Sequence, residues 1–300
     1  MDSRFIDLHA HAYRKPVPFV VQFCTVDELL RRYDDADIEM GCLLPIVNSE
    51  VYFPQANEDI LEMAEQHPDR FIPFCNVDPR ALTNSPDAEL NLVLQYYKDK
   101  GCRGLGEVMP NIPLLDPRVQ NLCRCAQDVG LPIVFDGSSR VGGDFGLQDE
   151  PGLPQLESTL LKYPNLIVFG HGRTFWIELS SDVTPGERKP VFRSDGEYLF
   201  PPYQSGPIEK EGVVPTLFRR YSNLLGELSD AYPFLDRDHD FGAKFLTEFQ
   251  DRLFFGTDIC FADMPFGMQT LLLQLRDSKK ISEEVFQKIA YKNAMNFFNL

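Results

Sequence analysis

Short apolar runs and longer amphipathic segments alternate along the whole chain. Eight apolar runs that end in polar or turn residues predict strands over Phe5–Leu8, Met40–Val47, Phe71–Val77, Cys102–Val108, Pro132–Asp136, Leu166–His171, Asn223–Leu228 and Leu253–Thr257. Apolar residues at helical spacing predict helices over Asn57–His67, Ala88–Lys100, Pro117–Val129, Leu153–Lys162, Leu246–Asp251 and Ser282–Phe298. Gly130 follows the third of these helices as a C-cap does, and Ser282 opens the last as an N-cap does.

Strands that alternate with helices favour parallel βα units, and eight of them are the number in a closed (β/α)8 TIM barrel. The chain has 300 residues, which fits one such domain over residues 1–300. A doubly wound open sheet is the rival arrangement, but its first turn is typically rich in glycine, whereas the first strand here ends in HAH. Residues 173–215 carry proline, glycine and charge between strands six and seven. We expect this insertion to form either a lid or pocket wall, or a solvated surface loop.

The amino-acid composition limits which kinds of molecule the protein is expected to bind. The chain carries 29 basic and 45 acidic side chains, a net charge of −16, which argues against nucleic acid or an anionic membrane as partner. The first residues are charged and no stretch approaches ~20 apolar residues, so we expect neither a secretory signal nor a membrane span. The seven cysteines are scattered, mostly within apolar runs, which predicts buried thiols in a reducing cytoplasm. A small-molecule substrate is the expected partner, and a homo-oligomer is left open.

Two histidines and one aspartate carry the first chemical signal. His9 and His11 lie two apart after a β-like run, so both imidazoles point to the same side of the strand. Two neutral imidazoles suit Zn2+ and its first-row neighbours. Asp258 ends the last predicted strand, which lies beside the first strand in a closed barrel. Its carboxylate could ligate the metal and accept a proton from metal-activated water, or it could merely cap the following helix.

Other polar residues end the later strands. His171 follows a buried apolar run and could ligate metal or act as a general acid or base. Glu107 and Asp136 end strands four and five, where metal ligation and a structural hydrogen bond to loop backbone are both open. Arg140, Arg173 and Trp176 follow strands five and six and could hold a carboxylate and an apolar ring of a substrate. The two remaining histidines, His67 and His239, are expected at the surface.

The assembled motifs resemble the amidohydrolase superfamily, and in particular its amidohydrolase family 2 branch of metal-dependent hydrolases and decarboxylases. The matching motifs are DLHAH, GLGE, GLPQLESTLLKYPNLIVFGHG, NLLGELS and RLFFGTDICF, and IAYKNAMNFFNL resembles the family's terminal helix. The resemblance implies that His9, His11 and Asp258 ligate a metal. It also implies that His171 is either a ligand of a second metal or an acid/base.

The chain departs from this family pattern at strand five, where family members commonly place a metal-binding histidine and this chain has Asp136. An aspartate ligand would make a harder site that accepts Mn2+ or Mg2+ as well as Zn2+, or it could weaken metal binding. The lysine that some members carry on strand four is not seen either, and Glu107 could take its place. We expect one divalent metal, with Zn2+ as the first choice.

The expected reaction is hydrolysis of an ester, lactone or amide carbonyl by metal-activated water, with Asp258 as the base and His171 beside the oxyanion. The alternative is metal-dependent, non-oxidative decarboxylation of an aromatic or unsaturated acid, with a proton delivered to carbon by His171 or Asp136. A third alternative, of another class, is an inactive barrel that serves as a binding protein.

Overall fold

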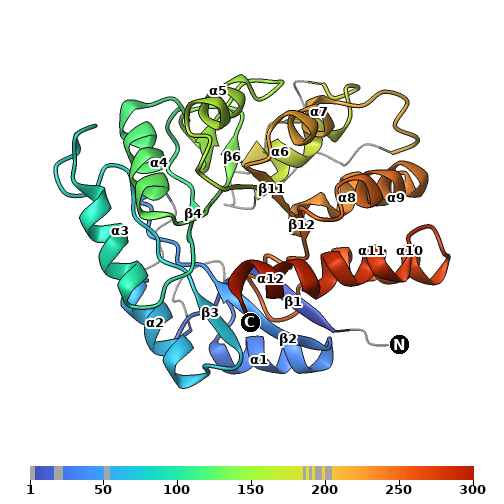
Figure 1. The fold of residues 1–300 in the computed structure, drawn as a ribbon, viewed down its shortest axis with the longest axis horizontal. Coiled ribbons are helices and arrows are strands. Elements are labelled where there is room, and N and C mark those ends of the chain that lie inside the picture. Colours follow the sequence, from blue (N-terminus) through green and yellow to red (C-terminus); the bar gives the residue numbers. More distant parts are fainter. Residues whose placement is uncertain are drawn as a thin grey trace.

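The computed structural model describes residues 4–16, 23–50, 55–184, 187–188, 191–192, 198–199 and 205–300. Its central feature is a ring of eight parallel strands, seen in part in Figure 1 with the helices outside them. The strands are β1 (Phe5–Ala10), β2 (Ile38–Leu43), β3 (Phe71–Pro73), β4 (Leu105–Val108), β5 (Ile133–Phe135), β8 (Val168–Gly170), β11 (Leu224–Glu227) and β12 (Leu253–Phe254). Parallel pairing joins them in two groups, β1-β2-β3 and β4-β5-β8-β11-β12.

Backbone hydrogen bonds connect the two groups at both seams. At the first seam, Cys75 after β3 donates to the Gly104 carbonyl and accepts from the Gly106 N–H, at 3.0 and 2.9 Å. At the second seam, the Leu8 N–H donates to the Phe255 carbonyl at 2.9 Å, and the Asp258 N–H donates to the His9 carbonyl at 2.8 Å. The predicted (β/α)8 barrel is thereby confirmed, with strand eight lying beside strand one.

The helices form the outer layer (Figure 1). They are α1 (Val26–Asp35), α2 (Asn57–Gln66), α3 (Leu90–Asp99), α4 (Pro117–Val129), α5 (Pro154–Lys162), α6 (Arg173–Trp176), α7 (Val213–Arg220), α8 (Tyr232–Asp236), α9 (His239–Glu248), α10 (Gly267–Asp277), α11 (Glu283–Gln287) and α12 (Asn293–Phe298). A π turn, η3 (Lys288–Lys292), joins α11 to α12, so the predicted terminal helix runs unbroken through it. Short 3-10 turns η1 (Ile177–Leu179) and η2 (Ser229–Ala231) follow α6 and β11.

Several predicted ends need correction. Most strands stop earlier than the apolar runs suggest, and β12, for example, stops at Phe254 rather than Thr257. Strand β1 instead runs two residues beyond the predicted Leu8, to Ala10. The helix before β12 is α9, which starts seven residues before the predicted Leu246, where the Asp238 side chain caps its first N–H groups. The predicted caps hold: Gly130 ends α4 with φ 74°, and the Ser282 hydroxyl accepts from the Val285 N–H.

The predicted insertion at 173–215 lies partly outside the described residues. Its first residues are helical rather than loop, because Gly172, at φ 82°, starts α6 directly after β8. Its last residues, from Val213, begin α7. Two short antiparallel strands, β9 (Val191–Phe192) and β10 (Tyr198–Leu199), lie between them, as do residues 187–188. The prediction of a lid over this segment stays a prediction.

Two short strands, β6 (Gly137–Ser138) and β7 (Leu147–Gln148), follow β5 and pair with each other, which restrains the loop between them.

All seven cysteines are free thiols, and every one except Cys260 is buried. Among the described helices, none combines the length and the apolar character that crossing a membrane requires.

Candidate active site

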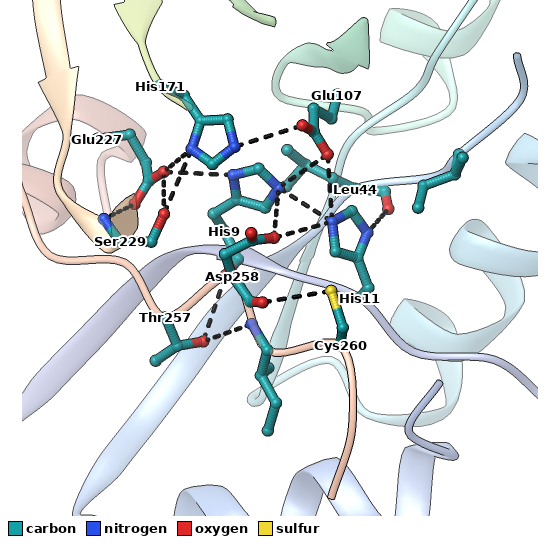
Figure 2. A network of polar contacts seen from close by, with 12 residues as sticks. His9, His11, Leu44, Glu107, His171, Glu227, Ser229, Thr257, Asp258 and Cys260 are labelled. Atoms are coloured by element: carbon teal, nitrogen blue, oxygen red, sulfur yellow. Dashed lines mark hydrogen bonds and ion pairs between the residues drawn. The ribbon is translucent and has the colours of Figure 1, made fainter. Parts of the chain in front are cut away.

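The carboxyl ends of the barrel strands bring three imidazoles and two carboxylates together. His9 lies in β1, His11 just after it, Glu107 in β4, and His171 and Asp258 just after β8 and β12. Figure 2 shows their side chains pointing toward one another. Four of them are almost fully buried, and the Asp258 side chain, 21% exposed, is the most open of the five.

The distances between the polar atoms are short and similar. The two Nε2 atoms of His9 and His11 lie 3.1 Å apart. Asp258 Oδ1 is 3.4 and 3.3 Å from these two nitrogens, and Glu107 Oε2 is 3.5 and 3.4 Å from them. Glu107 Oε1 faces His171 Nε2 at 3.3 Å. The atoms of His9, Glu107, His171 and Asp258 that could ligate a metal all lie within 4.8 Å of one another.

Hydrogen bonds at the far side of each ring fix the imidazole tautomers. His11 Nδ1 lies 2.9 Å from the Leu44 carbonyl, which can only accept, so Nδ1 carries the proton. His9 Nδ1 and His171 Nδ1 lie 3.3 and 2.6 Å from Glu227 Oε2, which gives them the same tautomer. In the neutral rings, the Nε2 lone pairs therefore all face the centre of the cluster.

This donor set fits one metal ion. Two Nε2 lone pairs 3.1 Å apart repel each other unless a cation lies between them, and two carboxylate oxygens approach the same point. Ligand atoms held at ~2.0–2.2 Å from one metal are ~3.0–3.5 Å apart along the edges of its coordination shell. The distances from His9 and His11 Nε2 to each other and to the Glu107 and Asp258 oxygens are 3.1–3.5 Å, so the residues present could hold a divalent metal.

The electrostatics of the cluster also favour a cation. Burial and the neighbouring His171 would lower the pKa of His9, but Asp258, Glu107 and Glu227 outweigh them and raise it to about 10. Burial would raise the pKa of Glu107, but hydrogen bonds to the three imidazoles hold it well below its usual range. The carboxylates thus hold positive charge in the cluster, as protons where no metal is bound.

Asp136, the predicted strand-five ligand, contacts the loop that follows β5. Its Oδ1 accepts from the Gly137 N–H at 2.8 Å, and a Cβ on Gly172 would approach the same oxygen to 2.0 Å. Asp136 is not in either group of described residues whose atoms could share a metal. The loop-bracing alternative therefore has the geometric support, whereas Glu107 Oε2 lies within 3.5 Å of the Nε2 atoms of His9 and His11.

The three residues expected to contact substrate lie in different surroundings. Trp176 is fully buried, and its Nε1 donates to the Glu227 carbonyl at 2.9 Å, which favours a packing role over substrate contact. Arg173 is nearly buried, lies over the Phe234 ring and donates to the Glu187 carbonyl at 3.2 Å. Arg140 donates to the Gly143 carbonyl in the loop after β6.

Glu227 is the main residue that the sequence reasoning missed. It ends β11, is fully buried, and accepts from His9, His171 and Ser229. Burial would raise its pKa, but the hydrogen bonds from His171 and His9 lower it to about 2. A polar residue at the end of a barrel strand was the signal used for Glu107, and the same signal in LLGELS would have found Glu227.

Asp230 and Asp7 were missed as well. Asp230 follows Glu227 on η2, and burial raises its pKa to about 6. Asp7 lies one layer below His9 in β1 and accepts from the Thr257 N–H and hydroxyl, at 2.9 and 2.5 Å. These two hydrogen bonds connect β1 to the segment that carries Asp258.

A closed parallel barrel with a histidine and carboxylate cluster at its carboxyl end defines a class of metal-dependent barrel enzymes. The chain belongs to the amidohydrolase family, whose family 2 model matches residues 6–300. It is therefore an enzyme of the amidohydrolase type, a group that contains metal-dependent hydrolases and decarboxylases. No curated protein matched the chain.

Solved structures share the fold at low sequence identity. An uncharacterized TIM-barrel protein from Bordetella bronchiseptica has a TM-score of 0.63 and 17% identity, covering 99% of this chain and 98% of its own. A probable 2-pyrone-4,6-dicarboxylic acid hydrolase from Acinetobacter baumannii has a TM-score of 0.57 and 13% identity, covering 100% of each chain. A 5-carboxyvanillate decarboxylase from Novosphingobium aromaticivorans, with bound manganese, has a TM-score of 0.60 and 16% identity, covering 99% and 97%.

Proposed function

We propose that the protein is a hydrolase that cleaves an uncharged ester, lactone or amide, with one divalent metal held by His9, His11, Glu107 and Asp258. The observation that carries the metal is the convergence of two Nε2 atoms and two carboxylate oxygens on one point. Imidazoles suit Zn2+ and carboxylates also suit Mn2+, so we propose Zn2+ first and Mn2+ as its competitor. When bound, the metal would supply Lewis acidity toward a carbonyl oxygen and acidify water.

The charge around the cluster supports an uncharged substrate. Five carboxyl groups, from Glu107, Asp136, Glu227, Asp230 and Asp258, surround three imidazoles. Within the described part of the chain, their only ion pairs are with histidines. One divalent metal and a protonated His171 balance the charges of Glu107, Glu227 and Asp258, so the site has no excess positive charge to attract a carboxylate substrate. This favours hydrolysis over decarboxylation of an organic acid.

Two side chains would move the protons. Asp258 directs Oδ1 at the imidazoles and is partly exposed, so its second oxygen could accept the proton of the attacking water. His171 directs Nε2 at the cluster, because Glu227 holds its Nδ1 proton at 2.6 Å. From there, a protonated Nε2 could hydrogen-bond to the oxyanion and then transfer its proton to the leaving group.

The test begins with metal analysis of protein purified without chelator. We expect about one divalent metal per chain and hydrolysis of a panel of uncharged esters, lactones and amides, lost with chelator and restored by Zn2+ or Mn2+. The same preparation is assayed for CO2 release from aromatic and unsaturated carboxylic acids. Metal-dependent CO2 release without hydrolysis would replace the proposal by the decarboxylase alternative. Protein that takes up no metal would favour the inactive barrel.

A further inference from the structure

One carboxylate oxygen, Glu227 Oε2, contacts two of the imidazoles from behind. It lies 3.3 Å from His9 Nδ1 and 2.6 Å from His171 Nδ1, and Figure 2 shows it on the far side of both rings. The Ser229 hydroxyl donates to the same oxygen at 2.7 Å. The other oxygen, Oε1, accepts from the Ser229 N–H, also at 2.7 Å. Both oxygens of this fully buried carboxylate therefore face donors only.

The surrounding chain is built to hold this carboxylate in place. A Cβ on Gly256 would lie 1.7 Å from Oε1, so only glycine in the FFGTD motif leaves room for the Glu227 side chain. The Trp176 Nε1–H donates to the Glu227 carbonyl at 2.9 Å and fixes the backbone from outside the barrel. Two separate elements thus restrain the position of one side chain.

We propose that Glu227 is the positioning residue that sets the tautomers of His9 and His171, and so turns the Nε2 lone pair of His9 toward the metal and Nε2 of His171 toward the reacting group. An imidazole ligates through its unprotonated nitrogen, so the proton must be held on the other one. Glu227 holds it on Nδ1 in both rings with a single oxygen. His11 has its own acceptor, the Leu44 carbonyl, and does not depend on Glu227. The inference rests on the proposed metal-dependent function.

The structure makes glutamine an unusually informative replacement. A glutamine amide has one acceptor oxygen and one NH2 donor, whereas donors surround both oxygens of Glu227. If the glutamine oxygen stays on the Ser229 N–H, its NH2 faces the two imidazoles and pushes their protons onto Nε2. If the amide group rotates by 180°, its NH2 faces the Ser229 N–H instead, so that two donors oppose each other. In either orientation, a buried donor faces a donor while the metal is bound.

The ordering of two variants separates positioning from simple packing. In E227A, no amide donor is fixed against the rings; the Ser229 hydroxyl, 3.3 Å from His171 Nδ1, can rotate to accept that ring's proton, and water can accept the proton of His9 Nδ1. We therefore expect E227Q to bind metal more weakly than E227A, although glutamine is much closer to glutamate in shape. A merely structural role of Glu227 predicts the reverse order, because alanine leaves the larger cavity.

The experiment measures the affinity for Co2+ and Zn2+ by competition with a chelator, and the thermal unfolding of metal-free and metal-loaded protein. E227Q should weaken metal binding about 10–100-fold, the range typical for loss of such a partner of a ligating histidine. The stabilisation by metal, measured as the difference between the metal-loaded and metal-free melting temperatures, should shrink relative to the wild type. The matched control is E178Q: Glu178 is also a buried carboxylate, but it pairs with Arg188 and accepts from the Gly152 N–H, away from the cluster. E178Q should lower the melting temperature and leave metal affinity unchanged.

The outcomes are distinguishable. Wild-type protein that binds neither Co2+ nor Zn2+ refutes the proposed function itself. Wild-type protein that binds metal while E227Q binds equally well refutes the role of Glu227 and leaves the function standing. Weaker binding by E227A than by E227Q also refutes it. If E227A does not fold, the comparison of E227Q with E178Q decides alone.

Discussion

Replacing Trp176 by phenylalanine separates two roles for the chain's single tryptophan. The ring is fully buried, stacks on Phe218 at 6.5 Å and meets Phe245 edge to face at 6.1 Å. Its Nε1–H donates to the Glu227 carbonyl at 2.9 Å. A packing residue should lose stability when it is replaced, whereas a substrate contact should raise KM.

The expected loss follows from two contributions. Phenylalanine lacks the indole N–H, so the buried Glu227 carbonyl loses its donor at a cost of ~1–3 kcal/mol. The smaller ring also leaves a cavity worth ~1 kcal/mol against Phe218 and Phe245. The free energy of unfolding should therefore fall by about 2–4 kcal/mol, which lowers the melting temperature by roughly 3–6 °C in a chain of this size.

Far-ultraviolet circular dichroism during thermal or guanidinium unfolding measures the change, since tryptophan fluorescence is removed with the residue. Phe245→Leu is the control, because it reduces the packing on the ring but keeps the N–H bond; we expect a loss of about 1 kcal/mol. KM should stay unchanged in W176F. Wild-type stability together with a raised KM would refute the packing role and restore the substrate contact that the sequence suggested.

Three other changes test the site and its surroundings. His171→Asn should lower turnover roughly 10²–10⁴-fold with about one metal per chain retained; metal lost in step with activity, measured by inductively coupled plasma mass spectrometry, would make His171 a ligand. Asp136→Ala should also retain its metal, because its carboxylate accepts from the Gly137 N–H outside the cluster; loss of metal would return Asp136 to the ligand set. Burial raises the pKa of Asp149 from 3.8 to about 6, so the folded state holds this proton more tightly than the unfolded state. The unfolding free energy of the wild type relative to Asp149→Asn should therefore fall by ~2–3 kcal/mol as pH rises from about 4 to 6; a difference independent of pH would contradict this.

The order of the barrel strands could be predicted because a short sequence pattern marks each strand. Each buried parallel strand is a short apolar run, and its polar exit marks the carboxyl end of the barrel. His9, His11 and Asp258 could be placed together for the same reason, since strands one and eight are neighbours once the barrel is closed. Glu107 could be placed at the mouth, but its distances to the imidazoles depend on how the β4 backbone approaches β1 across the barrel.

Other features depend on contacts that no local pattern contains. Helix α1 does have a local signal, a capping box in which Glu28 accepts from the Thr25 N–H. This helix was not predicted from the sequence, because its segment is rich in charged residues. The burial of Trp176 is different, because it follows from the packing of α6 against β11 at Gly226, where a Cβ would lie 3.0 Å from the indole ring. Proximity to His171 in sequence therefore suggested a place at the site that the tertiary packing does not give it.

The departure from the family pattern at Asp136 is best understood together with Glu107. Glu107 Oε2 lies within 3.5 Å of the Nε2 atoms of His9 and His11, so a fourth donor for the proposed metal comes from β4 and none is required from β5. Asp136 is then free to brace the loop at Gly137. The proposed ligand set contains two carboxylates rather than one, so it neutralises a divalent metal more fully and acidifies water less than a set with three imidazoles does. Chemistry at such a centre relies more heavily on a side chain that accepts the proton of water, which is the role that the partly exposed oxygen of Asp258 can serve.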